Sequence, residues 1–183
     1  MLKRRTIVQT SLAAGVVAGL AGLAGYANWK LDQGPEPPDG WWPAAWPFPR
    51  DGWPPGRAWR GHDLEVYVRP KLGFCGNCDT GVVSDDEVDR VTDIDLLDEK
   101  FLPLKEGSRV RITDLVGRAR LYSLKLKSGK QRLAEGIAVS YKCDLVVAIV
   151  LGKVDDEPIR KFAHAFLESN KVQVWVNQQL EGR

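Results

Sequence analysis

Apolar and polar residues alternate in several short segments of residues 61–183. In residues 63–69, DLEVYVR, every second residue is an aliphatic one, so these side chains lie on one face. This pattern is typical of a half-buried strand. Residues 108–115 repeat this alternation, and residues 120–133 repeat it on both sides of a Ser-Gly turn. The run Leu145–Leu151 is continuously apolar. It predicts a central strand buried on both faces.

The C-terminal part of the chain predicts one helix and a closing strand. Acidic residues 155–157 precede Pro158, an arrangement that suits a helix N-terminus. Apolar residues then recur at helical spacing, at Ile159, Phe162, Ala163, Phe166 and Leu167. In residues 171–177, KVQVWVN, three valines alternate with other residues and predict a last strand.

These patterns predict an α+β domain over residues 61–183. Its mostly antiparallel sheet has about five to six strands, and one amphipathic helix precedes the last strand. The acidic residues 85–99 do not reveal their secondary structure. Their oxygens lack the spacing of a calcium-binding EF-hand loop, so a solvated charged face is the favoured interpretation.

The stretch before this domain is rich in proline and tryptophan. Residues 34–61 contain eight of the eleven prolines and five of the seven tryptophans. Such proline density predicts an extended segment over residues 30–60, with turns at its two Asp-Gly pairs. The indole side chains could pack in three environments: on the surface of the following domain, at the membrane interface or against a partner protein. The candidates for the last two are Trp41, Trp42, Trp46 and Trp53.

Residues 1–29 have the pattern of an export signal. Basic residues 3–5 precede the uncharged, Ala- and Gly-rich residues 6–29. The pair Arg4-Arg5 followed by a polar and two apolar residues resembles a bacterial twin-arginine signal. This resemblance implies a periplasmic location for the rest of the chain.

Two fates of the signal stay open. The apolar stretch is long enough to remain as a single inner-membrane helix, which would anchor the protein. Gly25-Tyr26-Ala27 would equally suit cleavage after Ala27, which would release the protein from the membrane.

The net charge argues against nucleic-acid binding. Three of the positive charges lie in residues 3–5 and the formal net charge is only +2. The remainder therefore lacks the clustered basic surface of nucleic-acid-binding proteins.

Three cysteines are candidates for a disulfide, a redox pair or a metal site. They are Cys75, Cys78 and Cys143. An oxidising compartment favours a structural disulfide, although tetrahedral metal binding stays open. Residues 74–78, FCGNC, resemble the thioredoxin-type active site, which implies thiol–disulfide exchange. Asp79 follows the second cysteine, where haem attachment needs a histidine, and three cysteines are too few for an ordinary iron–sulfur cluster.

No catalytic residue or cofactor is assigned from the sequence. It contains no Gly-rich phosphate loop, no G-x-S-x-G elbow and no H-E-x-x-H helix. Of its two histidines, the helical His164 is interpreted as structural. His62 or His164 could complete the metal site of the cysteines, if there is one. The functional hypothesis is therefore an exported, membrane-tethered accessory protein that binds a protein partner in a periplasmic assembly. The alternative is a thiol–disulfide or metal-handling protein that uses Cys75 and Cys78.

The export signal is tested by replacing Arg4 and Arg5 with Lys. A reporter fused after Arg60 should then remain in the cytoplasm, because the twin-arginine pair is read specifically and not as charge alone. Cell fractionation measures the outcome. Unchanged export of the double variant would instead assign the chain to the general secretory route.

Overall fold

The computed structural model describes residues 37–48, 52–73, 81–82, 84–126 and 128–182. Residues 40–183 form one compact unit, and only residues 37–39 of the preceding unit are described. The predicted signal therefore lies outside the described residues. Among the helices that are described, none is long and apolar enough to cross a membrane.

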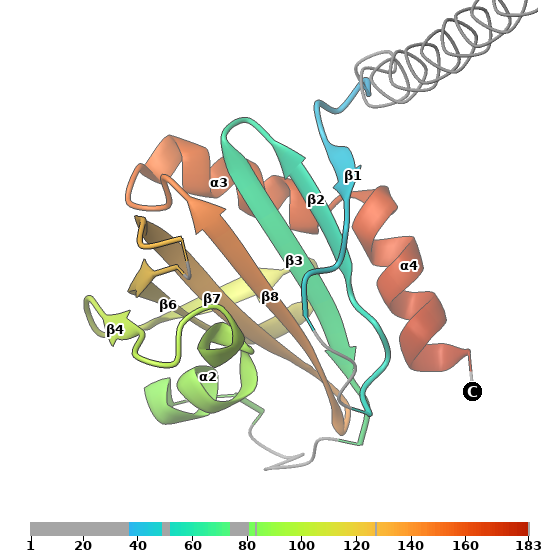
Figure 1. Cartoon of the computed structure of the whole chain (residues 1–183). Helices are drawn as coiled ribbons and strands as arrows, with labels where there is room; N and C mark the ends of the chain where they lie inside the picture. The colour runs from blue at the N-terminus through green and yellow to red at the C-terminus, as the bar shows by residue number, and fades with distance from the viewer. Residues whose placement is uncertain (1–36, 49–51, 74–80, 83, 127, 183) are drawn as a thin grey trace, which may run out of the picture. The chain divides into compact units, whose positions relative to one another are not determined.

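The described unit is built on one eight-stranded antiparallel sheet (Figure 1). Its strands run in the order β1-β2-β3-β8-β7-β6-β4, and β5 also pairs with β6. The strands are β1 (Trp42–Ala44), β2 (Arg57–Gly61), β3 (Leu64–Lys71), β4 (Leu102–Pro103), β5 (Ser108–Ile112), β6 (Leu115–Lys125), β7 (Gln131–Tyr141) and β8 (Asp144–Gly152). The helices are α2 (Asp85–Val91), α3 (Glu157–Leu167), α4 (Asn170–Glu181) and the short 3-10 helix η1 (Ile94–Leu96).

The predicted class, α+β with an antiparallel sheet, is confirmed, but the predicted numbers of elements are wrong. Within the described residues, the sheet has eight strands, not five or six, and three α-helices accompany it where one was expected. The prediction missed β1 and β4 because strands of three and two residues are too short to show an alternation. It also missed β2, which lies mostly within the residues assigned to the extended Pro/Trp-rich segment.

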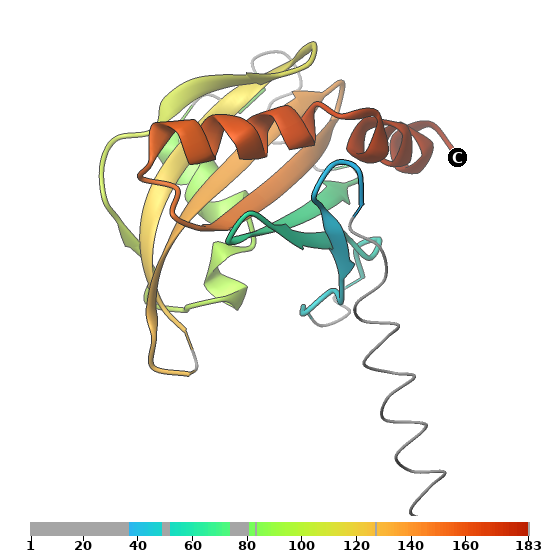
Figure 2. The same ribbon diagram turned by 90° about the horizontal axis from the view of Figure 1, so that it is seen from above.

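Strand β8 lies inside the sheet between β3 and β7, as its apolar run predicts. Successive side chains of a strand point to opposite faces. Val146, Ala148 and Val150 belong to the core cluster that includes α3 and α4. On the other face, Leu145 and Val147 pack with α2, and Ile149 packs with η1 and Phe48. Both faces of the sheet are therefore covered, as the second view of the fold makes visible (Figure 2).

Helix α3 begins as the sequence predicts. The Asp156 side chain accepts a hydrogen bond from the backbone N–H of Ile159 at 3.3 Å, and a proline occupies the first turn. Ala163, Phe166 and Leu167 are buried against the sheet. Phe162, which was expected on the same face, is 41% exposed and covers Trp41 from the outside.

The predicted last strand is wrong, because residues 171–177 belong to helix α4. The alternating valines conceal a helical pattern: Val172, Trp175, Val176 and Leu180 are buried, while Val174 is 55% exposed. The spacing i, i+3, i+4 and i+8 forms one helical face. Packing of this face against β3 outweighs the modest helix propensity of valine.

Strand β3 differs from its half-buried prediction, because its second face is also covered. Tyr67, Arg69 and Lys71 are all buried. Trp46 and Phe48 cover Tyr67, with ring centroids 6.4 and 5.5 Å from its ring. The Pro/Trp-rich residues thus pack on the domain, and β1 and β2 are strands of its sheet.

Trp41 attaches the Pro/Trp-rich residues to α3. Its side chain is 1% exposed and stacks on Phe166 at 4.2 Å between ring centroids. Its carbonyl oxygen accepts a hydrogen bond from Lys171 Nζ at 3.2 Å. Trp41 therefore connects the start of β1 to both C-terminal helices.

The substitution Trp41→Ala should lower the free energy of unfolding by ~3–5 kcal/mol, because it opens a cavity under Phe162 and Phe166. Trp42→Ala is the matched control: this neighbour is only partly buried, so its loss should be about 1 kcal/mol or less. Urea denaturation measures both variants. Equal losses would contradict the assigned role of Trp41.

Candidate functional site

A groove of about 690 Å³ lies beside β1 and is here called the Trp42 groove. It is lined by Trp42, Ala44, Ala45, Pro47, Arg60, Gly61, Asp63, Leu64, Glu65, Tyr67 and Arg132. Trp41 and Trp42 are consecutive, so they point to opposite faces of the sheet. Trp41 enters the core with α3, and Trp42 lines the groove.

Glu65 and Arg132 form a fixed ion pair in the Trp42 groove. Arg132 Nη1 donates to Glu65 Oε1 at 2.5 Å, and the Tyr67 hydroxyl donates to the other carboxylate oxygen. Burial by itself would raise the pKa of Glu65, but the hydrogen bonds from Tyr67 and Arg132 bring it below its usual range. Burial, and secondarily Glu65, raises the pKa of Tyr67. At neutral pH the carboxylate stays charged and the phenol stays protonated.

A second pocket of about 450 Å³ adjoins the groove, because Asp63 and Arg132 line both. Its other walls come from the ends of β6, β7 and β8, with Lys153 and Asp155 at the following turn. The groove and the pocket together give a depression that combines an apolar wall from residues 42–47 with charges of both signs. Such a mixture can anchor an apolar side chain and orient a charged one.

The four candidate tryptophans have different surroundings. Trp41 is in the core, whereas Trp46 lies against Phe48 at 4.9 Å and under the Arg69 guanidinium at 5.5 Å. Trp53 lies 5.9 Å from Lys71 Nζ. Of these four side chains, Trp42 is the one that lines the groove.

The acidic residues 85–99 are not simply the solvated face that the sequence favoured. Asp93 is buried at the centre of an ion cluster, 3.1 Å from Arg69 Nη1 and 2.5 Å from Lys71 Nζ. Its backbone has a φ of 60°, in the left-handed region that aspartate tolerates better than most residues. This residue joins the end of α2 to the second face of β3.

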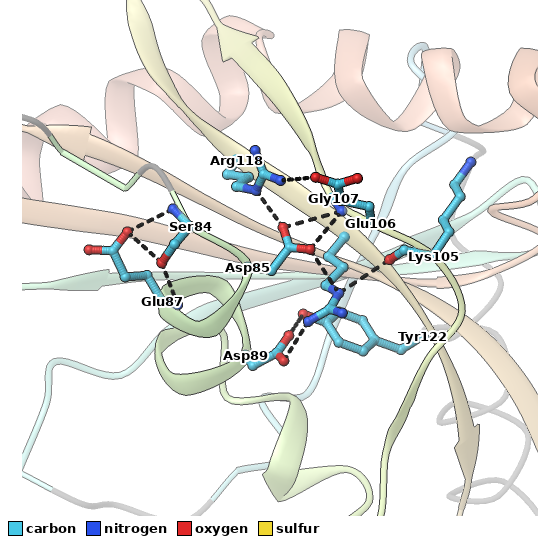
Figure 3. A network of polar contacts seen from close by, with 10 residues as sticks. Ser84, Asp85, Glu87, Asp89, Lys105, Glu106, Gly107, Arg118 and Tyr122 are labelled. Carbon is cyan, nitrogen blue, oxygen red and sulfur yellow. Dashed lines mark hydrogen bonds and ion pairs between the residues drawn. The ribbon is translucent and has the colours of Figure 1, made fainter.

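Two further aspartates dock α2 on β6 (Figure 3). Asp85 Oδ1 accepts from Arg118 Nε at 2.5 Å, and Asp89 Oδ2 accepts from Arg120 Nη1 at 2.7 Å. Burial works to raise the pKa of Asp85, but the Gly107 N–H and Arg118 lower it below its usual range. Both carboxylates therefore serve to hold α2 on the sheet, because each is already paired with an arginine of β6.

The helix in this contact begins at a capping box. The Ser84 hydroxyl accepts a hydrogen bond from the Glu87 backbone N–H, and the Glu87 carboxylate accepts from the Ser84 backbone N–H (Figure 3). The sequence S-D-D-E contained this start signal, which the acidic composition of the segment concealed.

Cys143 lies at the exposed turn between β7 and β8. It is disulfide-bonded. Cys75 and Cys78 lie outside the described residues, so the identity of the bonded partner is not described. Within the described ranges, no three His, Cys, Asp or Glu side chains gather closely enough to hold a metal ion.

The two histidines occupy separate environments. His62 lies against Phe162, with ring centroids 4.2 Å apart. His164 projects from α3 to the buried Glu135 of β7, with 2.8 Å between Nε2 and Oε2. The residue types alone gave no sign of the pairs Glu135–His164 and Glu65–Arg132, because each joins residues from different elements.

No protein-family model matches the chain, and no curated protein matches it. The class of protein therefore rests on the described unit itself: an α+β domain with an open groove of mixed character. The Glu65 carboxylate of this groove is already bound by Tyr67 and Arg132, which suits recognition better than proton transfer.

The disulfide provides a test of the cysteines. Cys143→Ser should lower the free energy of unfolding by ~2–4 kcal/mol, the usual loss for a native disulfide. Cys75→Ser and Cys78→Ser, measured beside it by urea denaturation, identify the partner as the variant with the same loss. Combining the partner variant with Cys143→Ser should add nothing further, because both remove one bond. Free Cys143 in air-purified protein, by intact-mass thiol counting, would reject the structural role.

Proposed function

We propose that this protein is an exported, membrane-tethered accessory protein of the periplasm, and that it binds a partner protein through the Trp42 groove. The signal pattern of residues 1–29 supports the location. The observation that carries the binding role is Trp42 itself, which lines an open groove beside charged side chains while the neighbouring indole is packed in the core. Tryptophan and arginine are preferred anchors in protein interfaces.

The occupant that suits the groove is an extended segment of a partner. Its apolar side chain contacts Trp42 and Pro47, and its acidic side chain approaches Arg60. Arg60 is exposed and lies opposite Glu65 in the register of β2 and β3, but it forms no ion pair within the described residues, whereas Arg132 is already bound to Glu65. An acidic residue is therefore expected beside Arg60, where it gains a charge-assisted contact without displacing an existing one.

Addition of a strand to β1 is not the proposed mode of binding. β1 is the edge strand of the sheet, but it has three residues and its middle residue is Pro43. Proline has no backbone N–H to donate, and short proline-containing edges disfavour pairing with another chain. Recognition is therefore assigned to side chains on the face of the sheet.

Thiol–disulfide exchange by the cysteines is the second candidate function. The exposure of the disulfide-bonded Cys143 favours it, because accessible disulfides exchange more readily than buried ones. The two candidates differ in their sites. Loss of partner binding in Trp42 and Arg60 variants supports the groove as the functional site. Loss of activity only in cysteine variants supports thiol–disulfide exchange.

Site-specific photo-crosslinking of the full chain in cells tests the groove. A photoreactive phenylalanine analogue in place of Trp42 should yield a discrete protein adduct, and Arg60→Glu should remove that adduct by repelling the acidic residue. The same analogue at Val174, exposed on α4 away from the groove, is the matched control. Adducts of equal yield from both positions, or an adduct insensitive to Arg60→Glu, would reject the groove as the binding site.

A further inference from the structure

The edge of the sheet formed by β5 is open within the described residues. β5 pairs with β6 alone, on the side of the sheet opposite to β1, and no described strand lies beyond it. Unlike β1, it has five residues and contains no proline. Such an edge presents unpaired backbone groups that an extended segment of another chain can meet.

The register of the β5–β6 hairpin identifies the backbone groups that point outward. Ile112 lies opposite Leu115 across the two-residue turn that joins the strands. Such a closing pair exchanges both of its hydrogen bonds, and hydrogen-bonded pairs alternate with non-hydrogen-bonded pairs along an antiparallel ladder. The N–H and C=O groups of Arg109 and Arg111 therefore point away from β6, toward the open edge.

The side chains of Arg109 and Arg111 lie on the face of the sheet opposite to α3. Val110 and Ile112 belong to the core cluster that includes α3, so the arginines beside them in the strand point to the other face. Both arginines are exposed and form no ion pair within the described part of the chain. Arg109 lies directly opposite Arg118, which a carboxylate of α2 already holds (Figure 3). Like charges in such positions repel, and an added carboxylate beside Arg109 would relieve this repulsion.

A groove of about 350 Å³ lies beside β5 on the α3 face of the sheet. Residues 108–111 line it from β5, and residues of α3 line it from the other side. The charges of α3 in this groove are already paired: Lys161 Nζ lies 2.7 Å from Glu157 Oε1, and His164 Nε2 lies 2.8 Å from Glu135 Oε2. A side chain that enters the groove from an added strand is therefore expected to be neutral.

We propose that the β5 edge binds an extended segment of a partner protein by strand addition, and that this segment carries acidic residues at two alternate positions. These acidic residues lie opposite Arg109 and Arg111, and the neutral residue between them points into the groove beside α3. Backbone hydrogen bonds contribute affinity, and the acidic–neutral–acidic pattern provides specificity. A second copy of this chain is not the occupant, because antiparallel pairing of two β5 edges would place arginines beside arginines. β5 contributes no residue to the Trp42 groove, so the site stands independently of the proposed function.

Synthetic peptides added to the full chain test the strand and its charge pattern. The probe is the end-blocked peptide Thr-Val-Glu-Thr-Glu-Val-Thr, whose affinity is measured by fluorescence anisotropy. N-methylation of either glutamate should weaken binding by roughly ten-fold or more, because the N–H groups of these residues face β5. N-methylation of the central threonine is the matched control, since its N–H points away. Equal losses at both positions, unchanged affinity of a peptide with Gln in place of both Glu, or absence of saturable binding would overturn the proposal.

Substitutions in the protein locate the peptide on β5. Arg109→Gln and Arg111→Gln should each weaken its binding by roughly three- to five-fold, the scale of one exposed charge pair. Arg60→Gln, at the Trp42 groove, is the matched control and should leave the affinity unchanged, which separates this test from that of the proposed function. Weaker binding by Arg60→Gln alone would overturn the proposal. A dimer of the full chain by light scattering, with the Arg109 and Arg111 amides protected from hydrogen exchange, would also overturn it by assigning the edge to a second copy.

Discussion

Burial of β8 on both faces is the constraint on which the rest of this structure depends. A central strand whose side chains are apolar on both sides requires a covering layer above and below the sheet. Helices α3 and α4 provide one layer. Helix α2, η1 and the Pro/Trp-rich residues provide the other, so residues that resemble a linker in composition become part of the core.

The second layer also has to accommodate charge. Arg69 and Lys71 lie on the covered face of β3, where an uncompensated cation would be costly. Asp93 provides the carboxylate, and the rings of Trp46 and Trp53 lie near the two cations. Buried ion pairs often contribute little net stability but penalise alternative arrangements. We infer that this cluster helps to fix how the second layer packs on the sheet.

Many charged and aromatic side chains are occupied by these structural contacts, so fewer surfaces are available to bind a partner. The acidic face of α2 is occupied by arginines of β6, and Trp41 is enclosed by α3. The Trp42 groove, with its mixed character, is one concave site that the architecture leaves open.

The sequence by itself determined the α+β class, the central strand, the start of α3 and the turn between β6 and β7, because each is encoded by neighbouring residues. Tertiary structure decided the rest. The valines of α4 form a helix because packing on β3 selects period 3.6 over period 2. Likewise, the pairs Glu65–Arg132 and Glu135–His164 join residues 67 and 29 positions apart. Strand register brings the first pair together, and packing of α3 on the sheet brings the second pair together. No local pattern encodes either arrangement.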